Sequence, residues 1–287
     1  MARYGIPWQG SKSRIAEWVV NVLPPSHTLV DLFGGGCAVT HCALLSGKWK
    51  NIITNDITDS VRVFYAAING EFDGYAACPA REEWFAYRGE DTASALLMSF
   101  GNDRTTYLWS PELEAVKRPA SLMISAGSIW ERYQWYHRFC DALREYLKSN
   151  SEPPNRLTEV EAAERLVQLE RVSRLQGLQG LQGDYRLVDI PDGATVYADP
   201  PYRGTANSKR YGEFDFDAFD QWLGGVDFPV FVSEFDAPAG CVEIASTERT
   251  TSMAATFTGK RTERIFVQER FYDQCKPLTL FDMMEEA

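Results

Sequence analysis

The sequence has few of the residue patterns that mark metal sites and disulfide frameworks. Its six cysteines are far apart and include no C-x-x-C pair, and its three histidines fall at no ligand spacing. A structural zinc site and a disulfide scaffold both need close, repeated spacings of these residues. We therefore expect no metal ion and no disulfide framework.

Long hydrophobic runs are also missing. No window approaches the roughly 18 uninterrupted apolar residues of a membrane span, and the N-terminus has no signal-peptide pattern. We expect a soluble, intracellular protein that makes no membrane contact.

Basic residues are outnumbered, with 29 Lys and Arg against 40 Asp and Glu, which gives a net charge of −11. A negative excess opposes binding to a polyanion. The excess is concentrated in residues 191–287, which carry 9 basic and 17 acidic side chains. The rest of the chain is close to neutral, so charge alone does not exclude a nucleic-acid partner.

The pattern that is present alternates strands with helices. Apolar periodicity predicts helices over residues 15–23, 37–45 and 61–68, with strands over 29–33 and 52–54 between them. This order is typical of the opening half of a doubly wound α/β sheet. Later segments add a helix over 215–223 and strands over 185–188, 195–198, 229–233 and 264–267.

The middle of the chain interrupts this pattern. Residues 75–155 are rich in Trp, Tyr and Arg and include a strong predicted helix over 129–147. After a linker over 151–155, Thr158 and Glu161 form a capping-box signature for a helix to about residue 175. Three tandem Leu-Gln-Gly units over 175–183 are interpreted as a flexible or duplicated loop. We expect a catalytic domain of residues 1–74 and 156–287, with 75–155 inserted into it.

The sharpest motif is Asp199-Pro200-Pro201-Tyr202, which directly follows the predicted strand 195–198. A rigid Pro-Pro turn is one interpretation. The position of the motif after a predicted strand favours a functional role instead, because open α/β sheets bind ligands at the carboxyl ends of their strands. A carboxylate beside a carbonyl suits an amino group with two hydrogens to donate, and a tyrosine offers a face on which a base can stack.

A glycine turn follows the first predicted strand, at Phe33-Gly34-Gly35-Gly36. It is not the dinucleotide fingerprint G-x-G-x-x-G, because residue 39 is valine. Asp56 ends the next strand, where an acid typically accepts hydrogen bonds from ribose hydroxyls. Together these features indicate an adenosine-type cofactor. The segment Trp8-Gln9-Gly10-Ser11-Lys12, taken alone, predicts only a helix cap with an exposed lysine.

In this order the three motifs resemble the Dam-like class of adenine-specific DNA methyltransferases. That class has a W-x-G-x-K opening, a Phe-x-Gly-x-Gly turn, an Asn-Asp strand end, an inserted target-recognition region and an Asp-Pro-Pro-Tyr motif. The resemblance covers residues 1–70 and 183–235. It implies a Rossmann-like S-adenosylmethionine-dependent methyltransferase sheet with an inserted, mainly helical target-recognition region, acting on double-stranded DNA.

The resemblance also implies roles for individual residues. Trp8, Lys12 and Asp31 would bind the methionine end of S-adenosylmethionine, and Phe33 with Gly34, Gly35 and Gly36 would lie beneath it. Asp56 would hold the ribose, and Asp184 with Tyr185, matching a strand start, would border the adenine. Asp199, Pro200 and Tyr202 would be catalytic, with Asp199 also at the cofactor. The family's second glycine falls at Cys37, which departs from the pattern.

The chemistry implied is direct transfer of a methyl group to the exocyclic amine of an adenine flipped out of the duplex. Candidate DNA-binding residues are Arg203, Lys209, Arg210, Arg104, Lys117 and Arg118. Surface charge is an equal explanation for each of them, and core packing is the better explanation for Tyr107, Trp109 and Trp130. We expect a phage, mobile-element or restriction–modification setting, in bacterial cytoplasm. The oligomeric state is open, with a monomer favoured.

Three alternatives stay open. The amine could belong to cytosine or to adenine in RNA, since related motifs serve both. The protein could instead be a non-catalytic DNA-binding relative that retains a cofactor pocket. An NAD-type oxidoreductase is disfavoured by the absent G-x-G-x-x-G pattern.

Overall fold

The computed structural model describes residues 4–68, 78–89, 93–154, 177–204, 214–254 and 257–275. The chain divides into two compact units. The first, called here the sheet unit, consists of Ile15–Gly34, Cys42–Thr58 and Gly177–Ala287. The second, called the helical unit, consists of Met1–Arg14, Gly35–His41 and Asp59–Gln176.

The sheet unit contains a seven-stranded sheet with the order β3-β2-β1-β4-β5-β7-β6. The first five strands in this order are parallel to one another. β7 runs antiparallel to its neighbour β5, and β6 runs antiparallel to β7. This arrangement confirms the predicted Rossmann-like α/β class. The strands are β1 (Thr28–Asp31), β2 (Asn51–Asp56), β3 (Leu178–Gln182), β4 (Thr195–Ala198), β5 (Val230–Glu234), β6 (Cys241–Ala254) and β7 (Phe257–Gln268).

The strand order reverses between β1 and β4. From β1 the chain moves outward to β2 and β3, and then returns to β4 on the other side of β1. Asp31 at the end of β1 pairs with Tyr197 of β4. Ligands of open α/β sheets bind beyond the carboxyl ends of the strands at such a reversal. The sheet therefore places its expected binding edge beside Asp31 and the residues that follow β4.

Both faces of the central strands are buried, as expected for a parallel sheet covered on each side. On one face, Val30, Val196 and Val232 pack against Phe219 and Leu223 of helix α10 (Phe216–Gly225). On the other face, Leu29, Tyr197 and Phe231 are equally buried. Asp215 begins α10 by accepting a hydrogen bond from the Ala218 backbone N–H, which satisfies one of the helix's open donors.

Two predictions for the segment 175–188 were wrong. Within the tandem Leu-Gln-Gly repeat, Leu178–Gln182 forms the edge strand β3, parallel to β2, instead of a loop. β2 needs a partner for its backbone groups, and its Ile52 N–H donates to the Gly177 carbonyl. Residues 185–188, expected as a strand, begin with the 3₁₀ turn η3 (Tyr185–Leu187). The Asp184 carboxylate closes this turn by accepting from the Arg186 N–H.

The other helices with residues in the sheet unit are α1 (Ala16–Val22), α2 (Ala38–Ser46, shared with the helical unit) and α11 (Tyr272–Cys275), with the 3₁₀ turn η4 (Glu269–Phe271). Those of the helical unit are α3 (Ser60–Ile68), α4 (Arg81–Tyr87), α5 (Ala93–Leu97), α6 (Pro111–Ser125) and α7 (Ile129–Ser149), with η1 (Phe100–Asn102). Four of these helices, α1, α2, α3 and α7, lie near their predicted positions, whereas the sequence pattern predicted no helix at α4, α5, α6 or α11. The helix predicted over 158–175 lies outside the described residues. Of the helices described, none is both long and apolar enough to cross a bilayer.

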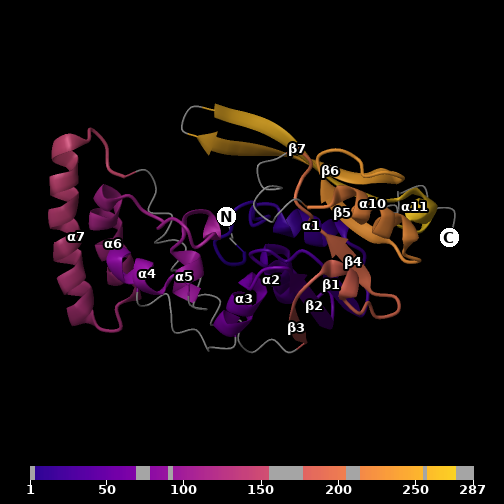
Figure 1. Ribbon diagram of the computed structural model, residues 1–287, viewed down its shortest axis with the longest axis horizontal. Helices are drawn as coiled ribbons and strands as arrows, with labels where there is room; N and C mark the ends of the chain where they lie inside the picture. Colours follow the sequence, from indigo (N-terminus) through magenta and orange to yellow (C-terminus); the bar gives the residue numbers. More distant parts are fainter. Residues whose placement is uncertain are drawn as a thin grey trace. The chain divides into compact units, whose positions relative to one another are not determined.

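Helices α6 and α7 of the helical unit lie side by side (Figure 1). The outward face of α7 is aromatic, and Trp130 is 66% exposed, whereas core packing was the favoured explanation for it. Tyr107 and Trp109 are buried, as core packing requires.

The β6–β7 hairpin is longer than its place in the sheet requires. β5 pairs with β7 only over Val232–Glu234 and Arg264–Phe266, whereas β6 and β7 pair as far as Ala254 and Phe257. The hairpin therefore extends past the end of β5, as Figure 1 shows. Glu263 is the first β7 residue beyond the pairing with β5.

Candidate active site

The Asp-Pro-Pro-Tyr motif begins at the residue after β4, at the carboxyl edge of the sheet. Asp199 is half-buried, and Pro200 and Tyr202 are buried. Beneath them, the Tyr197 phenol shares a 2.8 Å hydrogen bond with the Ser233 hydroxyl. Burial, with the nearby carboxyl groups of Asp199, Asp31 and Glu263, raises the pKa of Tyr197 well above its ordinary value. The strand that leads into the motif therefore contains a neutral, hydrogen-bonded phenol with three carboxyl groups nearby.

The loop after β4 is held by two buried glutamates. The Tyr202 phenol donates to Glu263 Oε1 on β7. The Arg203 backbone N–H donates to Glu234 Oε2 at the end of β5, over 3.2 Å. Glu234 and Glu263 are 3% and 0% exposed. Burial, together with Asp199 and Glu263, raises the pKa of Tyr202 well above its ordinary value, so the phenol remains a donor.

Asn55 ties together three strand ends on the other side of β1. Its side-chain amide donates to the Leu32 carbonyl (3.1 Å) and to the Gly183 carbonyl (3.0 Å). The backbone carbonyl of Asn55 accepts a hydrogen bond from the Gly34 N–H at 2.7 Å. Asp56, 7% exposed, accepts from the Thr58 N–H and hydroxyl through Oδ1. The side-chain amide of Asn55 therefore joins the residues that follow β1 and β3, and its backbone carbonyl holds the start of the glycine turn.

An aromatic cluster lies beside these strand ends. The Phe33 ring is 5.0 Å from that of Tyr185, and the Tyr185 ring contacts Phe219 and Trp222 of α10. Burial raises the pKa of Tyr185 to about 12. Asp184, predicted to border adenine, is ion-paired with Arg186. Phe33 and Tyr185 are thus partly buried aromatic residues packed against the core, at the place where the resemblance puts the cofactor.

The remaining predicted cofactor residues belong to the helical unit: Trp8, Lys12, Gly35 and Gly36. The chain leaves this unit after Arg14 and returns to it at Gly35. Lys12 is 5% exposed rather than exposed on a helix cap. A methyl group added at Gly36 would lie 2.5 Å from Trp8 Cβ and 2.8 Å from the Ile6 carbonyl oxygen. Glycine is required at 36 because the Trp8 segment packs directly on the turn, a contact that the sequence does not reveal.

The segment around Trp8 is also held from η1. The Asn102 side-chain amide donates to the Pro7 carbonyl at 3.1 Å, and its oxygen accepts from the Gln9 N–H at 3.4 Å. Asn102 and its neighbour Gly101 have φ angles of +63° and +73°. Asparagine and glycine are the residues that adopt this left-handed conformation most readily.

Cys37 stands where the resembling family has its second glycine, and its backbone explains the correspondence. Its φ is +56°, the left-handed region that glycine favours, and its side chain is fully buried. The turn keeps the glycine conformation although a thiol occupies the position.

We expect Cys37→Gly to be at least as stable as Cys37→Ala, although glycine fills less space. Alanine loses the thiol and keeps the backbone strain, whereas glycine removes strain worth about 1 kcal/mol. Urea unfolding of both variants measures the difference. A matched pair at Cys42, buried within α2, should show the opposite order, because glycine in a helix costs about 1 kcal/mol relative to alanine. A clearly less stable Cys37→Gly would contradict the strain.

His41 anchors the start of the described chain. The Gly5 N–H donates to its Nδ1 at 3.0 Å, and burial lowers the pKa of His41 to about 4. The unfolded chain has an ordinary imidazole pKa near 6.5, so between these values the unfolded state binds more protons. The free energy of unfolding should therefore fall by up to about 3 kcal/mol as the pH drops from about 6.5 to about 4.

Urea unfolding at a series of pH values measures this loss. His41→Asn keeps an acceptor near the Nδ1 position without a titrating group, so its stability should depend less on pH in the same window. Identical pH slopes for the two proteins would contradict the assignment.

Each described residue among the candidate DNA-binding side chains already contacts protein. Arg203 pairs with Asp220 at 2.7 Å, and Arg104 pairs with Asp59. Arg118 donates to the Cys78 carbonyl at 2.9 Å, and Lys117 is 5% exposed. Lys209 and Arg210 lie outside the described residues. A role in DNA binding for any of these residues stays a prediction.

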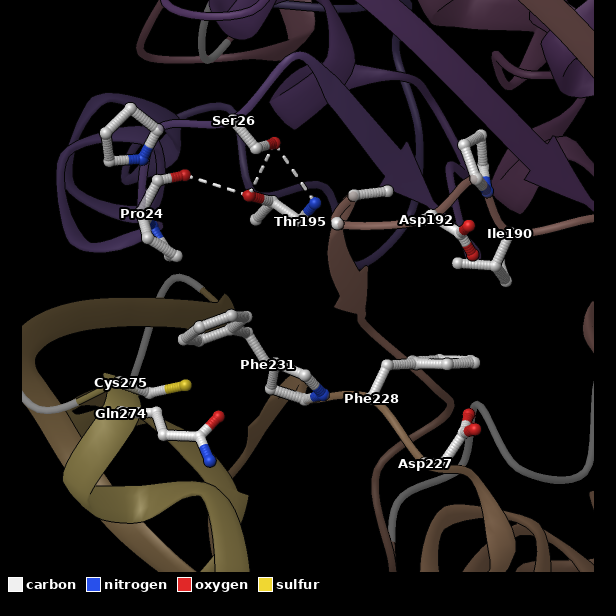
Figure 2. Close-up of a pocket in the computed structure, with 15 residues that line it drawn as sticks. Pro24, Ser26, Ile190, Asp192, Thr195, Asp227, Phe228, Phe231, Gln274 and Cys275 are labelled. Carbon is white, nitrogen blue, oxygen red and sulfur yellow. Dashed lines mark hydrogen bonds between the residues drawn. The ribbon is translucent and has the colours of Figure 1, made fainter.

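A hollow of about 410 Å³ in the sheet unit lies at the opposite edge of the sheet (Figure 2). It is lined by residues at the amino ends of strands, including Thr195, the first residue of β4, and Phe228, shortly before β5. The Thr195 hydroxyl is occupied by the Pro24 carbonyl and the Ser26 hydroxyl, each at 2.9 Å. The hollow is a poor candidate for the active site because it lies at the amino ends of the strands, whereas sheets of this type bind ligands at the carboxyl edge.

Within the described residues, no group of three or more His, Cys, Asp or Glu side chains is placed to hold a metal ion. The acids at the carboxyl edge instead fit an adenosine cofactor with a free amino group. Asp31, which is 1% exposed, ends β1, and Asp56, which is 7% exposed, ends the neighbouring strand β2.

The sequence interpretation missed Glu234, Glu263 and Asn102 as residues that hold the site. Neither glutamate belongs to a motif, and only pairing of β5 with β7 brings them to the loop after β4. Asn102 carried a local signal, since Gly-Asn is a turn pair, but its partner lies 95 residues away.

Strand order, carboxyl-edge acids and the motif after β4 together define the class as a Rossmann-like methyltransferase fold. Residues 8–93 match the family model described as D12 class N6 adenine-specific DNA methyltransferase. This match confirms the predicted resemblance to adenine-specific DNA methyltransferases. It includes Trp8, Lys12, the glycine turn and Asp56, whereas the Asp199–Tyr202 motif lies beyond it. No curated protein matches the chain.

Proposed function

We propose that the protein transfers a methyl group from S-adenosylmethionine to the N6 amine of adenine within a specific sequence of double-stranded DNA. The observation that carries the proposal is the position of Asp199-Pro200-Pro201-Tyr202 directly after β4, at the strand-order reversal. The family match over residues 8–93 supports the same chemistry independently of that motif.

The residues around β1 and β2 would hold the cofactor. Asp31 suits the amino group of its methionine part, Asp56 the ribose hydroxyls, and Phe33 with Tyr185 the adenine ring. Trp8 and Lys12, with the Gly34–Gly36 turn, are assigned to the methionine end by the resemblance. When bound, S-adenosylmethionine supplies a methyl group on a positively charged sulfur.

Asp199 and the Pro200 carbonyl would activate the target amine. The lone pair of the adenine amine is delocalised into the ring, which makes the nitrogen a poor nucleophile. Two acceptors that take its two hydrogens favour a tetrahedral nitrogen and localise the lone pair. They also stabilise the positive charge that develops on the nitrogen during attack on the methyl carbon. Asp199 then lies where it can accept the proton that the product loses.

Tyr202 would receive the flipped base. A base inside a duplex cannot reach a cofactor at the sheet edge, so the adenine must leave the stack at a cost of a few kcal/mol. Stacking on an aromatic ring returns about 1–3 kcal/mol. Recognition of the DNA sequence is assigned to the inserted region 75–155, and the setting proposed is a phage, a mobile element or a restriction–modification system.

Sequencing of methylated genomic DNA from a host that expresses the protein tests the proposal. It reports the modified base, its position and the surrounding sequence together. N6-methyladenine at a recurrent motif is expected. Methylation found only as N4-methylcytosine, or only in RNA, would replace the proposal by one of its alternatives. An Asp199→Ala strain controls for methylation by the host.

A further inference from the structure

The environment of Tyr202 contains a carboxyl group that the proposed chemistry does not use. Glu263 Oε1 accepts the hydrogen of the Tyr202 phenol, and Glu263 is fully buried. The Phe235 ring packs against the Tyr202 ring at 4.5 Å, with the two planes at 89°. The phenol end of the Tyr202 ring is therefore held by a residue of β7, and the ring also packs against Phe235, the residue after β5.

Such a carboxyl group is a costly way to fill a protein interior. Removing it from water costs several kcal/mol, and an apolar side chain of similar size is often as stable or more stable. Packing alone therefore gives no reason for glutamate at 263. Unlike an apolar side chain such as leucine, glutamate provides a hydrogen-bond acceptor at a fixed position.

The position of that acceptor is set by the sheet. Glu263 lies on β7 one residue beyond the pair Glu234–Arg264, so its backbone is set by the sheet. Glu234 holds the adjacent Arg203 N–H in the same way. The loop after β4 is thus attached to β5 through its backbone and to β7 through the tyrosine side chain.

We infer that Glu263 is a positioning residue: by accepting the phenol hydrogen of Tyr202, it fixes the ring on which the flipped adenine stacks. The inference rests on the proposed function. It assigns to Glu263 the placement of the target base beside Asp199, without contact to the base and without a part in methyl transfer. A misplacement of about 1 Å in such a site can cost about 100-fold in rate.

Three variants separate this role from a structural one. Glu263→Gln keeps an acceptor of the same shape and should retain kcat/KM within a few-fold. Glu263→Leu keeps the volume without an acceptor, and its kcat/KM for DNA should fall about 10- to 100-fold, with an unchanged Kd for S-adenosylmethionine. In a Tyr202→Phe background, which lacks the phenol, Glu263→Leu should have no further effect on kcat/KM. Glu243→Leu, at an exposed position on the facing strand, is the matched control.

A spectroscopic readout reports the base directly. The probe is a duplex that carries 2-aminopurine at the methylated position, because this base brightens when it leaves the stack and dims again on an aromatic ring. Complexes of the wild-type protein and Glu263→Gln should be equally dim, and the Glu263→Leu complex should be brighter. A merely structural change would not move this signal at saturating protein.

The outcomes are distinct. Wild-type protein that methylates no adenine would overturn the proposed function, and the inference with it. Active wild-type protein with an equally active and equally dim Glu263→Leu would overturn the inference alone. Glu263→Gln as impaired as Glu263→Leu would also overturn it, because the acceptor would then not be what matters.

Discussion

Replacing Asp199 with alanine should lower the rate of methyl transfer about 10³-fold, because one group that stabilises developing charge in a closed site contributes about 10²- to 10³-fold and the carboxylate also shapes the attacking nitrogen. Single-turnover transfer of labelled methyl groups to DNA measures the rate. Asp199→Asn keeps an acceptor but loses the charge, so its rate should lie between those of the wild type and Asp199→Ala.

The control for Asp199 is another aspartate of the sheet unit. Asp192 is exposed and lines the hollow at the opposite edge of the sheet. Asp192→Ala should transfer methyl groups at the wild-type rate. If Asp199→Ala retained more than about a tenth of the wild-type rate, the charge-stabilising role given to this residue would be wrong.

Replacing Asn55 with alanine should have the largest effect on the cofactor side of the site. The variant leaves the buried carbonyl of Leu32 and the partly buried carbonyl of Gly183 without the amide that joins them. Each unsatisfied buried group costs about 1–3 kcal/mol, so the free energy of unfolding should fall by about 2–4 kcal/mol. Because the Asn55 side chain joins the residue after β1 to the residue after β3, beside Asp56, we expect the Kd for S-adenosylmethionine to rise at least about tenfold, the equivalent of 1.4 kcal/mol.

Urea unfolding and calorimetric titration of S-adenosylmethionine measure the two effects. Asn150→Ala is the matched control, since its amide also donates to a carbonyl, that of Tyr146, but at the partly exposed end of α7. That variant should lose less than about 1 kcal/mol and bind the cofactor normally. Unchanged cofactor affinity in Asn55→Ala would show that this link does not matter for binding.

Local patterns in the sequence predicted most of the elements around the site. β4 occupies the predicted residues 195–198, and α7 and α10 begin within one residue of their predicted starts. These segments have strong signals: an apolar run ending in Asp-Pro-Pro, or a capping serine or aspartate before an amphipathic helix. The signals fail where pairing with a distant segment decides, as in β3, whose Leu-Gln-Gly composition favours a loop until β2 provides a partner.

The motif residues behave in the same way. Asp31, Asp56 and Asp199 follow predicted strands, and the parallel sheet brings them to its carboxyl edge. Their supports could not be predicted, because Asn55 acts on Gly183, 128 residues away, and Glu263 acts on Tyr202, 61 residues away. No local pattern marks a residue whose only role is to hold another one.

The sequence by itself determined which short contiguous motifs contain the residues proposed to contact cofactor and base, since each motif has its own strand and turn signals. The tertiary structure alone decided how those residues are held. The buried amide of Asn55, the buried carboxyl groups of Glu234 and Glu263, and the left-handed backbone at Cys37 acquire their roles only when the sheet is assembled. The physical reason is that a buried polar group is stabilised by a partner in space, and spacing along the chain does not encode that partner.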